Sequence, residues 1–387
     1  MQRESVSYIK SINARQVLKS IVENEATTRA DIAKKLKLSK PTVSVIVKQL
    51  LDDGWIYESG SGNASAGGGR RPVELAFNEK RSFIVGIDIG GTNVTLGITD
   101  LKGKVCAYRE FPTQQHLNKQ FFGEIKRCVE SMKSQLEINQ SQIIGLGAGV
   151  PGVTNVEEGI VIEAPALGWN NFPIRNKLQE IFDLPIYVDN DVNSVVLGEN
   201  WKGAAQDKSN LIYISIGTGI GSGIILNGEL YRGSNYSAGE IGYLVTDREE
   251  VKEFQPYLEG YGYLESVASG SSISLQLSKK KRKTVTSKEA YELYQKDDVD
   301  AVKVIDFAIE NLAIGMANYA SLFDPEIIIL GGGVSRSFSV MGEQLIKTIR
   351  KHTPQRCEIV QTTLGKEAGI IGGAALFLKE HDLLLNT

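Results

Sequence analysis

The sequence contains few cysteines and few histidines, and those it has lie far apart. Its 387 residues include only Cys106, Cys128, Cys357, His116, His352 and His381 of these types. An odd number of scattered cysteines excludes a disulfide framework, and none of these residues has the spacing of a zinc site. We therefore expect a protein of the reducing cytoplasm.

Two other patterns are missing. No stretch approaches the ~18 consecutive apolar residues of a membrane span, so we expect no membrane partner. The first residues are polar and no apolar segment follows them, so we expect no secretory signal. The composition, 42% hydrophobic and 23% charged, is that of a globular protein. At ~150 residues per domain, the length predicts two or three folding units.

Charge is distributed unevenly along the chain. The net charge is -3, whereas residues 1–80 hold 13 Lys and Arg against 9 Asp and Glu, a balance of +4. The remainder therefore carries -7. This asymmetry restricts a nucleic-acid partner to the N-terminal segment.

The N-terminal segment has the pattern of a helix-turn-helix. Residues 6–24 are predicted to be helical. Thr28 is a predicted cap of a second helix, and Ser39 of a third with Pro41 in its first turn. The second helix of such a pair offers its first residues to DNA. The expected DNA contacts on this helix are Ser39, Lys40, Thr42, Ser44 and Lys48. A three-helix packing module with a solvated face is the alternative.

A predicted hairpin follows these helices. Residues 55–58 and 73–77 are predicted strands, and the segment between them is rich in Ser, Gly and Ala. Such a hairpin with a basic tip is typical of the wing of a winged helix. Arg70 and Arg71 are expected to enter the narrow minor groove, where the negative potential is greatest. The alternative is an interdomain linker with two solvated arginines.

Three glycine-rich turns, each following a predicted buried strand, occur in the rest of the chain. The first is followed by a further predicted strand at residues 95–99. Backbone N–H groups of such turns bind phosphate, and an acid at the strand end can hold hydrated Mg²⁺. The expected nucleotide-binding residues are Asp88, Gly90, Gly91, Thr92, Gly217, Thr218, Gly219, Gly331 and Gly332. One such turn is weak evidence, but three in this order are much more specific.

Carboxylates and amides form a second predicted group. Sugar hydroxyls both donate and accept hydrogen bonds, and these side chains match that pattern. The expected effector-binding residues are Asn190, Asp191, Glu240, Tyr243 and Glu265. In a kinase, Asp191 would also take the proton of the attacking hydroxyl. The alternative is that Asp189 and Asp191 are only a helix N-cap and its neighbour. The run of cations at residues 279–283 is interpreted as a solvated loop.

The order of these motifs resembles the ROK family of bacterial sugar-responsive repressors and sugar kinases. The resemblance rests on the wing at residues 68–72, the Asp-Ile-Gly-Gly-Thr turn at 88–92 and the helix start at 190–193. It implies an α/β chain in which a winged helix-turn-helix precedes a two-lobed actin-like (ribonuclease H-like) ATPase or sugar kinase fold. The expected domains are residues 1–80, a first lobe at 81–190 and a second at 191–387, whose last helix packs back on the first lobe.

The chain departs from the family pattern at three places. Tyr243 replaces a usual His, and the interval 244–262 lacks Cys and His, so zinc is not expected. Aromatic residues are the expected substitute for that metal: Phe254, Tyr257, Tyr261 and Tyr263. Ala166 replaces an Asn that often contacts sugar in the family. The phosphate turn is intact, although many repressors of the family have lost it.

The DNA-binding segment places the chain on the repressor branch, which includes xylose repressors. The first hypothesis is a repressor of a carbohydrate catabolic operon, relieved by a small sugar or polyol bound between the lobes. The resemblance implies homodimers or tetramers on a near-palindromic, double-stranded operator. A sugar-responsive activator uses the same parts with the opposite sign. An ATP-dependent sugar kinase with an accessory DNA-binding domain stays open, with Mg-ATP as its cosubstrate.

Overall fold

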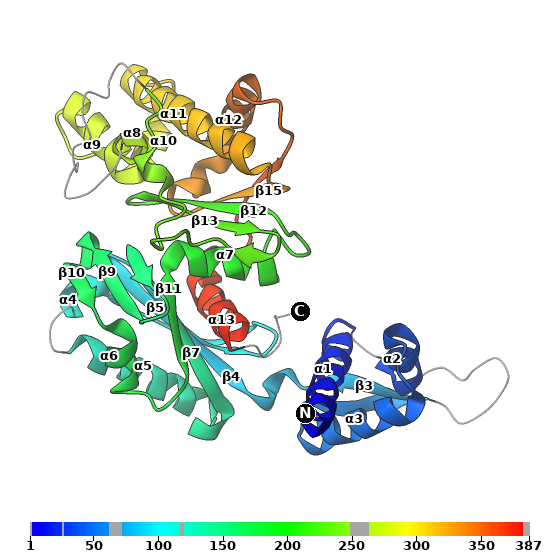
Figure 1. Cartoon of the computed structure of the whole chain (residues 1–387). Helices are drawn as coiled ribbons and strands as arrows, with labels where there is room; N and C mark the ends of the chain where they lie inside the picture. Colours follow the sequence, from blue (N-terminus) through cyan, green and yellow to red (C-terminus); the bar gives the residue numbers. More distant parts are fainter. Residues whose placement is uncertain (1, 25–26, 62–71, 117–119, 248–262, 382–387) are drawn as a thin grey trace.

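The computed structural model describes residues 2–24, 27–61, 72–116, 120–247 and 263–381. Figure 1 shows a small N-terminal body beside two larger lobes, each built around a β-sheet. No helix among these described residues is long and apolar enough to cross a membrane.

The N-terminal body is a helix-turn-helix with a small antiparallel sheet. Its helices are α1 (Gln2–Val22), α2 (Arg29–Leu36) and α3 (Lys40–Asp52). Its strands, in the sheet order β1-β3-β2, are β1 (Thr27–Thr28), β2 (Ile56–Ser61) and β3 (Val73–Phe77). The two strands predicted to flank the wing are therefore confirmed. Arg70 and Arg71 lie outside the described residues.

Side-chain caps start α2 and α3 where the sequence predicts them. Thr28 Oγ1 accepts a hydrogen bond from the Asp31 N–H at 3.3 Å, and Ser39 Oγ accepts one from the Thr42 N–H at 3.2 Å. Lys37 ends α2 in the left-handed conformation, with φ of 55°. Together these three residues fix the turn between the helices. The apolar face of α3 is buried, with Val43, Ile46, Val47 and Leu50 inward.

The first lobe is built on a five-stranded mixed sheet in the order β11-β7-β4-β5-β6. Its strands are β4 (Phe83–Ile89), β5 (Asn93–Asp100), β6 (Val105–Pro112), β7 (Ile143–Val150) and β11 (Ile186–Asn190). A smaller sheet contains β8 (Val153–Asn155), β9 (Ile160–Ala164) and β10 (Trp169–Phe172). The lobe also contains helices α4 (Thr113–His116), α5 (Phe121–Leu136) and α6 (Ile174–Gln179).

The prediction of a separate strand at residues 95–99 is wrong. The Gly90 N–H donates to the Asn93 carbonyl at 3.0 Å and closes a short turn. Pairing with β4 then runs without a break from Val94 opposite Ile89 to Asp100 opposite Phe83. Because no residue interrupts this ladder, β5 is one strand.

The second lobe has a five-stranded sheet in the order β14-β13-β12-β15-β16. Its strands are β12 (Leu211–Ile216), β13 (Ile220–Leu226), β14 (Glu229–Leu230), β15 (Ile327–Gly331) and β16 (Glu358–Gln361). The helices above it in Figure 1 are α8 (Tyr263–Ala268), α9 (Gly270–Lys281), α10 (Ser287–Tyr294), α11 (Val299–Phe323) and α12 (Phe338–His352). A single apolar core joins this sheet to these helices.

The prediction of a solvated loop at residues 279–283 is wrong for residues 279–281, which are helical, whereas Arg282 and Lys283 follow the helix. Helix α9 continues to Lys281, and Arg282 then ends it in the left-handed conformation. The Lys281 ammonium lies 2.8 Å from Asp298 and 2.9 Å from Asp300. Cations favour the last turn of a helix because the carbonyl groups there carry partial negative charge.

Two helices form a layer between the lobe sheets, α7 (Asp191–Lys202) and α13 (Ala368–Glu380). The backbone of α13 lies directly on β4 and β7. A Cβ at Gly86 would meet the Ile370 carbonyl oxygen at 2.1 Å, and one at Gly147 would meet that of Gly373 at 1.9 Å. Glycine is therefore required at both strand positions. Helix α7 packs against α13 and also contacts β13 of the second lobe, so the two helices connect the sheets of both lobes.

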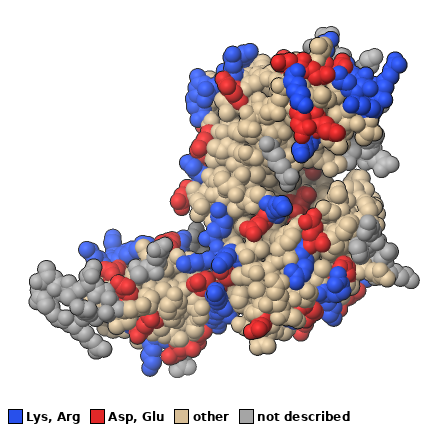
Figure 2. Space-filling view, turned by 180° about the vertical axis from the view of Figure 1, so that it is seen from behind, with Lys and Arg blue, Asp and Glu red and all other residues tan. Residues whose placement is uncertain are grey.

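The N-terminal body is attached to the first lobe by polar and apolar contacts. The Leu101 N–H donates to the Glu79 carbonyl at 3.0 Å. Arg81 lies 4.0 Å from the centre of the Trp55 ring and donates to the Asp53 carbonyl at 2.8 Å. The apolar core of the body continues into the lobe and reaches α13 through Phe377 and Leu378. Figure 2 shows Lys and Arg side chains gathered where the body meets the lobes.

Candidate functional site

The site begins at the end of β4, where Asp88 precedes the predicted phosphate turn. A Cβ at Gly369 would lie 2.4 Å from Asp88 Oδ2, so the carboxyl group faces the start of α13. Burial, then the nearby charge of Asp191, raises the pKa of Asp88 to about 7. The turn is held by Thr113, whose hydroxyl donates to the Gly90 carbonyl at 2.7 Å and whose N–H donates to the Thr92 carbonyl at 2.8 Å.

Asn190 joins β11 to α7 and caps that helix. Its Oδ1 accepts hydrogen bonds from the Val192 and Asn193 N–H groups at 2.9 and 3.1 Å. Its Nδ2 donates to the Gly152 carbonyl at 3.0 Å. The cap is therefore Asn190, and neither Asp189 nor Asp191 holds that position. Because both ends of the amide have protein partners, Asn190 fixes the junction between β11 and α7.

Asp191 occupies the first position of α7 and faces the space beside Asp88. Its Oδ1 accepts from the Val192 N–H at 2.9 Å. Burial raises its pKa even though this backbone hydrogen bond lowers it. A Cβ at Gly149 would lie 3.0 Å from the Asp191 Cα, so β7 passes directly behind this residue. The predicted strand-to-helix junction is confirmed.

The second lobe supplies Glu240, Tyr243 and Glu265. Burial, then the charge of Asp191, raises the pKa of Glu240. Glu265 Oε2 accepts from the Ile220 N–H at 2.6 Å, and burial raises its pKa to about 7. Tyr243 is 43% exposed, and its pKa is raised by burial and then by Glu240.

Glu265 has a role that its motif did not reveal. A Cβ at Gly219 would meet its Oε2 at 2.4 Å. The Glu265 carboxyl group therefore packs against the backbone of the Gly217–Gly219 turn. The Gly217 carbonyl accepts from the Gly270 N–H at 2.8 Å, and the Ser271 hydroxyl donates to the Thr218 carbonyl. This turn is thus fastened to the start of α9.

The third glycine turn lies at the end of β15. Gly332 has a φ of +79°, and a Cβ at Gly331 would overlap the Tyr213 hydroxyl at 1.7 Å. Glycine is therefore required at position 332 by the backbone conformation and at position 331 by the Tyr213 side chain.

The structure thus gathers carboxyl groups from both lobes. The charges of Asp88 and Asp191 interact, as do those of Asp191 and Glu240 and those of Glu240 and Glu265. Raised pKa values leave part of this set protonated near neutral pH, so it can both donate and accept hydrogen bonds. Such a set suits neighbouring hydroxyl groups of a neutral polyhydroxy ligand.

Sequence reasoning missed a charged triad beside this site. Arg232 Nε lies 2.7 Å from Asp189 Oδ2, and Arg232 Nη2 lies 2.7 Å from Glu380 Oε1. Asp189 is 1% exposed. An aspartate inside an otherwise apolar strand end signals a cationic partner, but nothing in the sequence identified Arg232 as that partner.

The predicted DNA contacts on α3 fall into two groups. Lys40, Ser44 and Lys48 are exposed. Ser39 and Thr42 share a hydrogen bond between their hydroxyl groups at 2.7 Å and form the cap. The sequence analysis missed exposed Val45, which lies about 200° around the helix from buried Val43. That angular offset, read from the sequence, could have identified it.

The expected aromatic substitute for zinc lies mainly at residues 248–262, outside the described residues. Within the described part of the chain, no group of three or more His, Cys, Asp or Glu side chains is placed to hold a metal ion.

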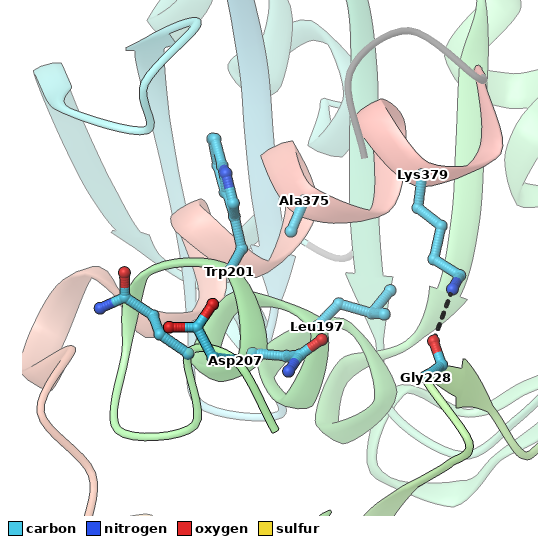
Figure 3. Close-up of a pocket in the computed structure, with 8 residues that line it drawn as sticks. Leu197, Trp201, Asp207, Gly228, Ala375 and Lys379 are labelled. Atoms are coloured by element: carbon cyan, nitrogen blue, oxygen red, sulfur yellow. Dashed lines mark hydrogen bonds between the residues drawn. The ribbon is translucent and has the colours of Figure 1, made fainter. Parts of the chain in front are cut away.

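A cavity of about 190 Å³ lies outside the predicted site. It is enclosed by α7, α13 and the turn before β14, where Lys379 Nζ donates to the Gly228 carbonyl at 3.1 Å (Figure 3). Its lining residues are Leu197, Asn200, Trp201, Gln206, Asp207, Gly228, Ala375 and Lys379. None of the predicted effector or nucleotide residues lines it.

Comparison with known proteins gives two family matches. Residues 10–57 match a winged helix-turn-helix DNA-binding family, and residues 84–380 match the ROK family. A xylose repressor of Caldicellulosiruptor bescii is 32% identical over 91% of this chain and 90% of its own. A glucokinase of Halalkalibacterium halodurans is 33% identical over 78% of this chain and 96% of its own.

Solved structures agree with these matches. The crystal structure of a ROK family transcriptional regulator, a homolog of the E. coli MLC protein, has a TM-score of 0.81 and 25% identity. It covers 97% of this chain and 98% of its own. The predicted fold class is confirmed from the winged helix through both lobes. Since the family match spans most of the sequence, this chain belongs to the ROK family.

Proposed function

We propose that the protein is a DNA-binding repressor whose affinity for its operator falls when a small sugar or polyol binds between the lobes. One observation carries the proposal: a helix-turn-helix with an exposed cationic helix shares a continuous core with lobes whose carboxyl groups converge. The similar xylose repressor and MLC homolog align with this chain over at least 90% of their own lengths, so the likeness includes the N-terminal body and both lobes.

The convergent carboxyl groups define the ligand class. Asp88 and Asp191 come from the first lobe and α7, and Glu240 and Glu265 from the second. A ligand that hydrogen-bonds both sets favours one relative position of the lobes. A ligand shifts the balance between two conformations only if it binds one of them more tightly than the other. To weaken DNA binding, this ligand must therefore bind more tightly to the conformation that binds DNA poorly.

The core provides a route from this site to DNA. Helix α13 begins beside Asp88 and carries Phe377 and Leu378 near its C-terminal end, where they belong to the apolar core of the N-terminal body. A shift of α13 therefore moves the helix-turn-helix. In a homodimer, such a movement changes the separation of two α3 helices, and binding to a near-palindromic operator depends on that separation. Xylose is the first candidate effector, because several similar proteins are named xylose repressors.

The experiment is a titration of an operator duplex with the full chain, in the presence and absence of a panel of sugars and polyols. One compound is expected to weaken binding at least about tenfold, a coupling of about 1.4 kcal/mol. Asp191→Ala should bind the duplex normally and lose the response to that compound. If no sugar, polyol or sugar phosphate changes the affinity of the wild-type chain, the effector part of the proposal is wrong.

A sugar kinase is the second candidate, favoured by the intact turn at residues 90–92, which follows Asp88, and by Asp191, whose charge acts on Asp88. The similar H. halodurans protein is a glucokinase. In this function, Asp191 would accept the proton of the attacking hydroxyl, and the glycine turns would bind the phosphates of Mg-ATP. A coupled assay of ADP release decides: turnover abolished by Asp191→Asn supports the kinase, and no turnover with any sugar leaves the repressor.

A further inference from the structure

Among residues 12–24, 27–60 and 72–77, whose side-chain exposure the structure describes, Val45 on α3 is the most exposed large apolar residue. It is 69% exposed, whereas its neighbours Val43 and Val47 are both fully buried. The core of the body therefore does not need Val45. Helix formation does not need it either, because a β-branched residue is a weaker helix former than most straight-chain residues.

The surroundings of Val45 identify the surface to which it belongs. Pro41, Ser44, Val45 and Lys48 have the spacing i, i+3, i+4 and i+7, which aligns them along one exposed face of α3. Recognition helices read base pairs with residues at this spacing. Lys40 and Lys48 flank Val45 and suit phosphate groups. A single apolar side chain between two cations is too small for a protein docking surface.

We propose that Val45 reads the methyl group of a thymine in each operator half-site, an inference that rests on the proposed DNA-binding function. Valine has no hydrogen-bonding group, and among the four base pairs only thymine presents an apolar group in the major groove. Contact between the two removes both surfaces from water. Cytosine at that position has only a hydrogen at C5 where thymine has the methyl, and its N4 amino group replaces the O4 acceptor, so the apolar contact with Val45 is lost.

The test removes the methyl group from the DNA and the apolar group from the protein, separately and together. The full wild-type chain first selects its preferred duplex from a random library. Each thymine of that duplex is then replaced singly by deoxyuridine, which lacks only the methyl group. We expect one such replacement in each half-site to weaken wild-type binding about four- to tenfold.

The decisive comparison is with Val45→Ala. At the position read by Val45, this variant should bind the thymine and deoxyuridine duplexes with affinities within about twofold, because its partner for the methyl group is gone. Val299→Ala is the matched control, since Val299 is 67% exposed and lies on α11 in the second lobe. The control should respond to every replacement as the wild type does.

The outcomes separate this inference from the proposed function. If the wild-type chain selects no duplex, the DNA-binding function itself fails. If a duplex is selected but every deoxyuridine replacement affects wild type and Val45→Ala equally, Val45 does not read thymine and the inference is overturned. Thermal unfolding of Val45→Ala should match that of the wild type, because the side chain is exposed.

Discussion

Arg232 Nε lies 2.7 Å from Asp189 Oδ2 and joins the second lobe to the end of β11 in the first. The same guanidinium reaches Glu380 at the end of α13. Beside it, Lys379 pairs with Glu229 at 2.9 Å. Both lobes are therefore connected by charge to the C-terminal end of α13, the helix that continues into the core of the DNA-binding body.

Removal of Arg232 should destabilise the protein strongly. Burial raises the pKa of Asp189, and the Arg232 charge opposes that rise. In Arg232→Ala, an unpaired carboxylate stays buried, which costs about 3–5 kcal/mol of unfolding free energy. The measurement is urea denaturation at neutral pH.

A surface pair provides the control for this measurement. Arg127 contacts Glu124 on α5, and its side chain is 71% exposed, so Arg127→Ala should change the unfolding free energy little. The double variant Arg232→Ala/Asp189→Ala should recover part of the stability lost in Arg232→Ala, because it removes the buried charge. Equal losses in Arg232→Ala and Arg127→Ala would contradict a buried pair.

Stability should also fall as the pH rises from 5 to 8. The pKa values of Asp88 and Glu265 are raised from 3.8 and 4.5 to about 7 by burial, so the folded state binds these protons more tightly than the unfolded state. Their contribution is fully present below pH ~4 and is lost as the pH rises through ~7. We expect a loss of roughly 1–3 kcal/mol by urea denaturation.

The double variant Asp88→Asn/Glu265→Gln tests this assignment. The new amides do not titrate, and the amide introduced at position 265 keeps an oxygen that can accept from the Ile220 N–H, as Glu265 does. The variant should lose less stability than the wild type between pH 5 and 8. Parallel pH profiles for the two proteins would assign the loss to other groups.

Features that depend on neighbouring residues, such as helix caps and strand ends, were predicted correctly from the sequence. Thr28 and Ser39 are good N-cap residues followed by apolar periodicity, and both cap helices as expected. The strand-to-helix junction at residues 186–202 follows from an apolar run that ends in Asn. Adjacent residues determine these features, so one sequence is enough to find them.

Long-range pairing could not be predicted in this way. Arg232 and Asp189 are 43 positions apart, and the fold brings them together from the second lobe and from the end of β11. Glu265 was predicted from its motif, but the hydrogen bond that its Oε2 accepts from the Ile220 N–H could not be. Lys281 ends α9 and pairs with Asp298 and Asp300 at the start of α11, a contact between two elements that local sequence does not predict.

A methyl group on β7 should detach α13 from the first lobe. In Gly147→Ala, the new Cβ would lie 1.9 Å from the Gly373 carbonyl oxygen, and neither the strand nor the helix backbone can move without its neighbours. We expect the unfolding free energy to fall by at least about 3 kcal/mol, or no folded protein to form, measured by thermal unfolding and circular dichroism.

Gly123→Ala on α5 is the control, because nothing lies within 4 Å of its added Cβ. That variant should be as stable as the wild type or up to about 1 kcal/mol more stable.

Lys48 should contribute to DNA affinity through phosphate rather than through base sequence. It is exposed on α3, at the end of the face that also carries Ser44 and Val45. Loss of one phosphate contact reduces the slope of log affinity against log salt by about 1 and weakens all duplexes to a similar extent. Lys48→Ala should therefore bind the selected duplex and a scrambled duplex more weakly by similar factors, measured by fluorescence anisotropy between ~50 and ~200 mM salt.

Lys177→Ala on α6 is the matched control, because that lysine lies in the first lobe and pairs with Glu180 at 2.7 Å. A Lys48→Ala variant that loses affinity only for the selected duplex, with an unchanged salt slope, would instead make Lys48 a base-reading residue.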